Sequence, residues 1–175
     1  MDIEIRRERP EDTAGIRRVL LEAFGQPDEA RIVESIRQRD DPVISLVALV
    51  DGELVGHIMF SPVTITSDDG QWLAAGLAPM AVLPSLQRQG IGQQLVARGL
   101  EMCRQERYER VVVLGHPSYY PRFGFQPAHM FGIAWEYDAP KEAFMALALR
   151  PGALDACSGT ARYLAEFTQD HRSED

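Results

Sequence analysis

A strand, a polar loop and a helix follow one another without a spacer over residues 80–93, and this junction constrains the fold more than any other part of the chain. The apolar run stops at Pro84, a loop rich in Gln and Arg follows, and Gly90 and Gly92 stand where a helical pattern begins. Glycine permits close backbone approach and dihedral angles that other residues avoid. The start of a helix leaves unpaired N–H groups and a partial positive charge, which attract anions. The junction therefore predicts an anion site, to which Arg88 adds a full positive charge.

Two other kinds of phosphate loop are excluded by their spacing. A dinucleotide fingerprint G-x-G-x-x-G that began at Gly90 would need glycine at the position of Leu95, and the Gly-Lys-Ser/Thr of a Walker loop is absent. The remaining pattern is Q-x-x-G-x-G directly after a strand, over residues 87–92.

The hydrophobic periodicity of the whole chain predicts a mixture of helices and strands. Apolar residues at helical spacing favour helices from about 13 to 24, at 28–39 and at 90–107. Apolar and β-branched runs favour strands at 3–7, 44–50, 54–65, in the segment that ends at 77–83, at 110–114 and at 143–149, and the segment 161–167 is ambiguous. Turn signals at 51–52 and 68–70 join the central strands into a meander. No repeat or linker is visible, so we expect one α+β domain over residues 1–175, with a core at about 3–149 and a C-terminal extension at 150–175.

Composition narrows the class of protein. A chain of 175 residues with 45% hydrophobic residues is typical of one folded domain. The uncharged apolar stretches, such as 42–50 and 73–84, are shorter than the roughly 18 residues of a membrane helix. The acidic start does not resemble a secretory signal, and the two cysteines have no spacing suited to zinc or to a disulfide scaffold. We therefore expect a cytoplasmic protein with no membrane segment and no metal.

The charge of the chain is unevenly distributed. The net charge is −8, and residues 1–75, 76–125 and 126–175 carry −7, +3 and −4. Sequence-independent binding to nucleic acid depends on many basic side chains, so an acidic chain is a poor candidate for it. The basic central block can still hold a small phosphorylated ligand.

In its motifs the chain resembles the GNAT superfamily of N-acetyltransferases, and within it a YhbS-like branch of bacterial predicted acetyltransferases. Residues 87–92, Gln-Arg-Gln-Gly-Ile-Gly, match the family's acetyl-coenzyme A signature Q/R-x-x-G-x-G/A, which follows the fourth strand. Residues 120–125, Tyr-Pro-Arg-Phe-Gly-Phe, resemble the family's Y-x-x-x-G-F motif. The resemblance implies a GNAT-like acyl-CoA N-acyltransferase fold, in which helices flank a mixed sheet that splays between its fourth and fifth strands.

The resemblance also implies roles for individual residues. The fourth strand would pair with the pantetheine arm, the backbone near Ala81 and Val82 would hold the tetrahedral oxyanion, and Tyr120 would protonate the departing thiolate. Tyr119, its neighbour, is the alternative acid. The cofactor-binding residues implied in this way are Met80, Ala81, Val82, Gln87, Arg88, Gln89, Gly90, Ile91, Gly92 and Gln93.

The general base is not assigned by the motifs. Many members of the family carry a glutamate on or near the fourth strand, but residues 77–83 include no carboxylate. His116, directly after the fifth strand, is the candidate base, with transfer through water as the alternative. His116 could equally be a histidine that only bonds backbone in the turn before Pro117. His57, inside the third strand, is expected to be a packed strand residue.

The function implied by the resemblance is transfer of an acetyl group from acetyl-CoA, as co-substrate, to an amine. The alternative is a GNAT-shaped sensor or interaction domain that binds an acyl-CoA without catalysis. The acceptor, a small-molecule or peptide amine, is not identified by the sequence; residues 25–41 and 131–142 are expected to shape its site. Acidic flanks on either side of the basic block favour a cationic amine. The oligomeric state stays open, and a homodimer is one arrangement that the resemblance allows.

Overall fold

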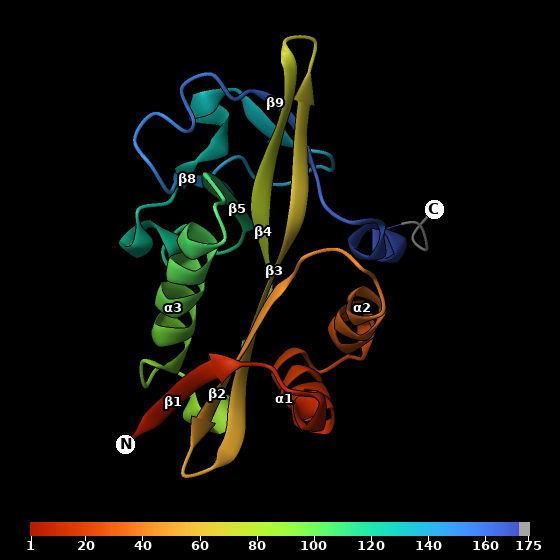
Figure 1. Ribbon diagram of the computed structural model, residues 1–175, viewed down its shortest axis with the longest axis vertical. Coiled ribbons are helices and arrows are strands. Elements are labelled where there is room, and N and C mark those ends of the chain that lie inside the picture. The colour runs from red at the N-terminus through yellow and green to blue at the C-terminus, as the bar shows by residue number, and fades with distance from the viewer. Residues whose placement is uncertain (172–175) are drawn as a thin grey trace. The chain divides into compact units, whose positions relative to one another are not determined.

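The structure, a computed structural model, describes residues 1–171 (Figure 1). Its helices and strands are β1 (Ile3–Arg7), α1 (Thr13–Phe24), α2 (Asp28–Arg37), β2 (Ile44–Val50), β3 (Glu53–Ser67), β4 (Gly70–Val82), α3 (Ile91–Gln105), β5 (Arg110–Leu114), β6 (Gln126–Pro127), β7 (Ile133–Trp135), β8 (Phe144–Ala148) and β9 (Gly159–Arg162). The strands β1, β2 and β5 begin and end at the residues that the sequence predicts, 3–7, 44–50 and 110–114. The ambiguous segment 161–167 is divided between β9 and a 3₁₀ helix at Ala165–His171.

The strands form a mixed sheet. In the part of the chain that the structure describes, nine strands take part, in the order β1-β2-β3-β4-β5-β8-β6, with β9 beside β3 and β7 beside β9. The pairs β4–β5 and β7–β9 are parallel, whereas β1–β2, β2–β3 and β5–β8 are antiparallel. The parallel register of β4 with β5 runs from Ala75 to Leu77, and β4 continues to Val82.

The chain divides into two compact units, each of which combines segments distant in the sequence. Unit 1 contains Met1–Phe60, Pro79–Met102 and the tail from Ala165. Unit 2 contains Ser61–Ala78 and Cys103–Leu164. The long strands β3 and β4 contribute to both.

Helices cover both faces of the strands in unit 1. Figure 1 shows α1 and α2 on one side of β2 and β3, and α3 on the other. The apolar stripes face the strands, because Ile16, Val19 and Leu20 of α1 are buried, as are Val33 and Ile36 of α2. Phe24, which shares the helical spacing of these apolar residues, is instead 40% exposed. It is the last residue of the helix, which Gly25 ends in a left-handed conformation with φ of 70°.

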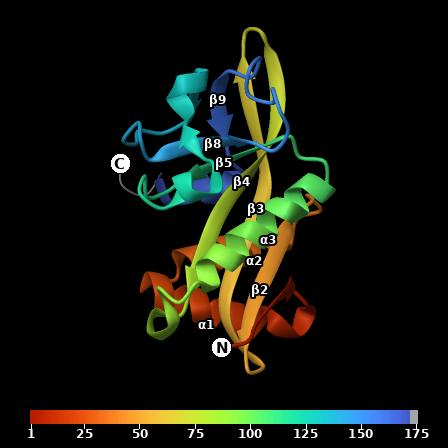
Figure 2. The same ribbon diagram turned by 90° about the vertical axis from the view of Figure 1, so that its left-hand side faces the viewer.

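The helix α3 lies close to the backbone of β3 (Figure 2). A Cβ atom added at Gly99 would lie 2.2 Å from Cε2 of Phe60, and one added at Gly56 would lie 3.0 Å from Cδ1 of Leu95. These two glycines therefore allow helix and strand to pack more closely than any larger residues would. Close packing fixes the helix to which the loop of residues 83–90 leads.

Unit 2 has its own apolar core, formed by β3, β4, β5, β8 and β9. Its buried residues include Val63, Ala74, Val112, Phe144 and Ala161. Trp72 and Trp135 are partly buried and pack against this core. These two tryptophans therefore contribute to the apolar core of unit 2.

No helix within residues 1–171 is long and apolar enough to cross a membrane.

Candidate functional site

The loop between β4 and α3 is held by hydrogen bonds to the end of the strand. Gln87 donates a side-chain hydrogen bond from Nε2 to the Val82 carbonyl at 3.1 Å. The Leu86 N–H donates to the Leu83 carbonyl at 2.9 Å. Gln87 therefore has a structural role, because it fastens the loop to the strand, while the next residues stay exposed.

Two residues of this loop adopt left-handed backbone conformations. Gly90 has φ of 87° and Arg88 has φ of 63°. A Cβ at Gly90 would meet nothing within 4 Å, so glycine is required there by the dihedral angle and the space above it is open. Gly92 has no positive φ and lies in the first turn of α3. Of the two glycines, Gly90 therefore uses the dihedral freedom of glycine and Gly92 does not, while the conformation of Arg88 has no signal in the sequence.

The N-terminus of α3 presents unpaired donors. The Gln94 N–H donates to the Gly90 carbonyl at 3.1 Å, so the N–H groups before it, including those of Gly92 and Gln93, have no partner within the helix. The first turn contains no carboxylate, and the helix is 15 residues long, so its dipole is well developed. The exposed guanidinium of Arg88 adds positive charge. This arrangement suits a phosphate group.

The strand β4 ends beside β3, which fixes the direction of its backbone groups. The Leu83 N–H donates to the Val55 carbonyl at 2.9 Å. Successive residues of a strand direct their N–H groups to opposite sides, so Ala81 faces β3 like Leu83, whereas Met80 and Val82 face away from it. The Gln87 side chain, which reaches the Val82 carbonyl, is consistent with that direction. Of the two residues predicted to hold an oxyanion, only Val82 directs its N–H away from β3.

In unit 2, a tight turn after β5 holds His116 and Tyr120. The N–H groups of Tyr119 and Tyr120 approach the His116 carbonyl at 3.0 and 3.4 Å. A Cβ at Gly115 would lie 2.3 Å from Cε2 of Tyr120, so this glycine is required for the ring to pack. The His116 side chain is exposed, and Tyr120 is buried against Phe125 with ring centroids 5.7 Å apart.

The two neighbouring tyrosines differ in burial, since Tyr120 is buried and Tyr119 is only partly buried. Burial raises the pKa of Tyr120 to about 12, and it also raises the pKa of Tyr119. The guanidinium of Arg122 lies 4.4 Å from the centroid of the Tyr119 ring, and its Nε donates to the Tyr119 carbonyl at 2.8 Å. Both phenols therefore stay protonated across the neutral range, and Tyr119 is in addition engaged by Arg122.

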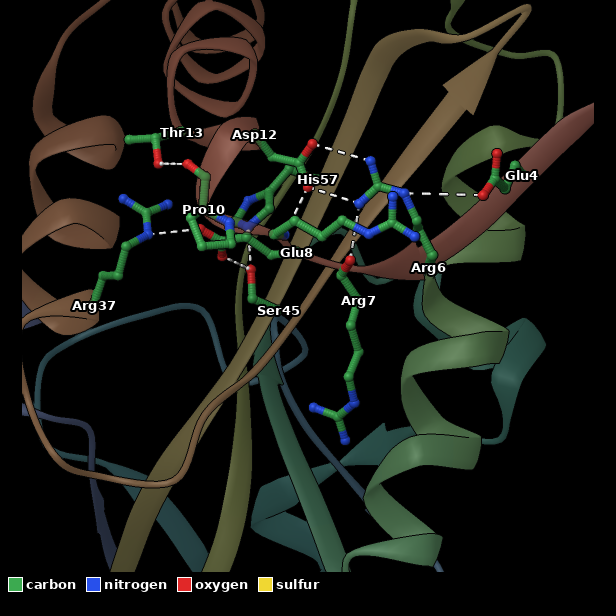
Figure 3. Close-up of polar contacts among 11 residues, drawn as sticks. Glu4, Arg6, Arg7, Glu8, Pro10, Asp12, Thr13, Arg37, Ser45 and His57 are labelled. Atoms are coloured by element: carbon green, nitrogen blue, oxygen red, sulfur yellow. Dashed lines mark hydrogen bonds and ion pairs between the residues drawn. The ribbon is translucent and has the colours of Figure 1, made fainter.

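His57 is packed inside the strand β3, as the sequence predicts. It is fully buried, and burial lowers its pKa from 6.5 to about 3, with Arg37 contributing. It is a packed residue of β3 that belongs to a polar cluster with Ser45 and Glu8 (Figure 3). The Ser45 hydroxyl lies 2.8 Å from Nε2 of His57 and donates a hydrogen bond to Oε2 of Glu8. The only signal in the sequence was a polar residue in each of two apolar strands, Ser45 and His57.

Comparison with known proteins identifies the family. Residues 4–128 match the family model described as acetyltransferase (GNAT) domain. The chain is 35% identical to the N-acetyltransferase YhbS of Escherichia coli strain K12 over 166 residues, which cover 94% of this chain and 98% of YhbS. The chain belongs to the GNAT acetyltransferase family. It is accordingly an acyltransferase of the N-acetyltransferase type.

Solved structures of GNAT acetyltransferases confirm the α+β fold. YhbS from Escherichia coli in complex with CoA superposes with a TM-score of 0.88 at 34% identity, covering 95% of this chain and 92% of YhbS. A GNAT acetyltransferase from Brucella melitensis in complex with acetyl-CoA superposes with a TM-score of 0.76 at 36% identity, covering 95% and 98%.

Proposed function

We propose that this GNAT acetyltransferase uses acetyl-CoA to acetylate a cationic amine. The pyrophosphate of acetyl-CoA is proposed to bind to the loop before α3. The observation that supports the proposal most is the loop geometry: a left-handed Gly90 under open space, at the start of a helix without a carboxylate in its first turn. Coenzyme A carries about four negative charges. The block of the chain that includes this loop carries +3, whereas both flanks are acidic.

The residues from Gln87 to Gln93 are the proposed pyrophosphate site, with Gln87 in a supporting role through its bond to Val82. Met80, Ala81 and Val82 are proposed to run beside the pantetheine arm. The Val82 N–H, which faces away from β3, is our candidate donor to the tetrahedral oxyanion.

Proton transfer is proposed to use Tyr120 as the acid. When the amine has attacked the acetyl carbonyl, the C–S bond breaks and the thiolate needs a proton. A phenol with a pKa of about 12 stays protonated at neutral pH and can donate it. His116, exposed on the same turn, is the proposed base, and water is the alternative acceptor of the amine proton.

The acceptor site is proposed to involve residues 25–41 and 131–142, which belong to the acidic flanks. A single catalytic domain and a cytoplasmic location are proposed, and the buried, unpaired Cys103 and Cys157 are consistent with a reducing compartment. Association of two copies as a homodimer stays a prediction.

The test is a panel of amines incubated with acetyl-CoA and the full chain. The panel contains polyamines, aminoglycosides, lysine peptides and peptides with free N-termini, together with neutral and anionic amines. We expect thiol release matched by the mass gain of one acetyl group on cationic members. Tight acetyl-CoA binding without turnover on any acceptor would instead indicate a sensor, and acceptors that are mostly neutral or anionic would contradict the cationic assignment.

A further inference from the structure

The chain contains a single lysine. Of its 18 basic residues all are arginine except Lys141. The guanidinium of arginine stays charged in proteins, whereas a lysine amine can lose its proton and act as a nucleophile. Lys141 is therefore the one side-chain amine of this sequence that can accept an acetyl group.

Lys141 lies at the tip of a tight turn in the loop between β7 and β8. The Ala143 N–H donates to the Pro140 carbonyl at 2.9 Å, which closes a β-turn with Lys141 and Glu142 at its centre. Both of these central residues are exposed. Among the residues that the structure describes, none forms an ion pair or a hydrogen bond with the Lys141 amine. The amine is thus accessible to a reactant.

The turn that contains Lys141 is bonded to the turn that holds Tyr120, and both belong to unit 2. The Gly115 N–H donates to the Ala143 carbonyl at 2.9 Å, next to the antiparallel pair of β5 and β8 (Figure 2). The Tyr120 ring packs against Gly115, since a Cβ added there would lie 2.3 Å from Cε2 of the ring. Two residues of chain span at most about 7 Å, so the backbone of Lys141 lies within that distance of Ala143. Lys141 is therefore a neighbour of the proposed acid and of His116, the residue after Gly115.

The loop around Lys141 also matches the acceptor that the proposed function requires. Residues 131–142 are one of the two segments proposed to shape the acceptor site, and Lys141 is itself a cationic amine. The loop contains the carboxylates of Glu136, Asp138 and Glu142, so Lys141 supplies its one positive charge. Acetylation of Lys141 removes that charge and leaves the loop more acidic.

We propose that the enzyme acetylates its own Lys141, within one chain. This inference rests on the proposed function, because the acetyl group comes from acetyl-CoA and the acid is Tyr120. The Nζ atom of Lys141 first loses a proton to His116 or to water and then attacks the acetyl carbonyl carbon. The N–C bond forms, the C–S bond breaks, and the departing thiolate takes a proton from Tyr120. The products are acetylated Lys141 and free CoA.

The test is incubation of the full chain with saturating acetyl-CoA and no added amine, followed over time by mass spectrometry of the intact protein and of its peptides. We expect the mass gain of one acetyl group at Lys141, with a half-time that does not change when the protein is diluted about tenfold. The folded chain should react at least about tenfold faster than the chain unfolded in urea, since positioned acid and base groups contribute roughly 10²- to 10⁴-fold. Lys141→Arg, which keeps the charge, should lose this modification, and Tyr120→Phe should slow it at least about tenfold.

The panel of amines is measured on the same preparation, which separates this inference from the proposed function. Turnover on the panel without acetylation of Lys141 would overturn this inference alone, whereas the absence of both would overturn both. Equal rates in the folded and the urea-unfolded chain would mean purely chemical acetylation of an exposed amine. A half-time that lengthens on dilution would mean transfer between copies of the chain. Either of these two results would overturn self-acetylation within one chain.

Discussion

Tyr120 is buried under its turn, and burial raises its pKa to about 12. We expect Tyr120→Phe to lower kcat roughly 10- to 100-fold while the Kd of acetyl-CoA is unchanged, because the lost proton is needed only when the thiolate departs. Below about pH 10 the wild-type rate should show no loss from ionisation of this phenol, since its pKa lies higher. Steady-state kinetics and calorimetry measure the two quantities.

Tyr119→Phe is the matched control, because Tyr119 lies beside Tyr120 and is engaged by Arg122. It should retain most of the turnover. Unchanged turnover in Tyr120→Phe would remove Tyr120 from the acid role.

His57 makes stability depend on pH. Its pKa is about 3 in the folded protein and 6.5 as the ordinary value, so between these limits the unfolded chain binds more protons than the folded one. The contribution of neutral His57 to the free energy of unfolding should therefore be fully present above pH 6.5. As the pH decreases toward 3, the free energy of unfolding should fall by up to about 1.4 kcal/mol per pH unit. Urea unfolding at pH 7.5, 6 and 5 measures this slope.

In His57→Gln the titrating group is absent, so the slope over the same pH range should become shallower, whatever the variant's stability at pH 7.5. An identical slope in the variant and the wild type would show that other groups cause the acid sensitivity.

For individual residues, the sequence predicted features that depend on neighbours in the chain. The loop motif correctly identified a glycine with a special dihedral at Gly90, because the strand, loop and helix around it are adjacent in the chain. It could not predict the Glu8, Ser45 and His57 cluster, whose members come from three strand regions and meet only in the folded sheet. The catalytic roles of Tyr120 and His116 stay predictions.

Among the contacts between helices and strands, the one between α3 and β3 is the most sharply defined. Gly99→Ala would place Cβ 2.2 Å from the buried ring of Phe60, so the helix or the ring must move. We expect the free energy of unfolding to decrease by about 2 kcal/mol, the usual cost of overpacking a core. Chemical denaturation measures it.

Phe60→Leu in the Gly99→Ala background should recover part of the loss, because a smaller side chain makes room. Ala97→Ser, exposed on the same helix, should change the free energy of unfolding by less than about 0.5 kcal/mol. Equal effects of Gly99→Ala and Ala97→Ser would contradict the close packing.

Elements with dense or periodic apolar patterns were predicted well, and the shortest strands were not. The strands β2 and β5 and the helix α3 have dense apolar patterns that suffice to identify them. The strands β6, β7 and β9 contain only two to four residues. They exist because other strands offer partner edges: β8 pairs with β6, β3 pairs with β9, and β9 pairs with β7. Such pairing depends on tertiary structure and leaves little trace in local sequence.

Over the molecule as a whole, the distribution of charge matches the proposed binding sites. The basic central block contains the loop before α3, and the acidic flanks contain the segments proposed to face the acceptor. The two compact units are both discontinuous in sequence, and β3 and β4 contribute to each. Hydrophobic patterns describe elements one at a time, so they predicted the α+β class but not this partition.

The proposed function depends above all on binding of acetyl-CoA by the loop before α3. Gly90→Glu inserts bulk and negative charge into the open space at the helix N-terminus. Gly52→Glu is its matched control, because Gly52 has φ of 80°, also has nothing within 4 Å of its added Cβ, and lies in the β2–β3 turn. The two variants thus carry the same charge and a similar backbone strain.

Calorimetric titration of acetyl-CoA into the wild type and both variants is the decisive measurement. We predict that Gly52→Glu binds like the wild type and that Gly90→Glu binds at least about 100-fold more weakly, a loss of roughly 2.7 kcal/mol. Binding by Gly90→Glu that equals the wild type would contradict the assignment of this loop to the acetyl donor.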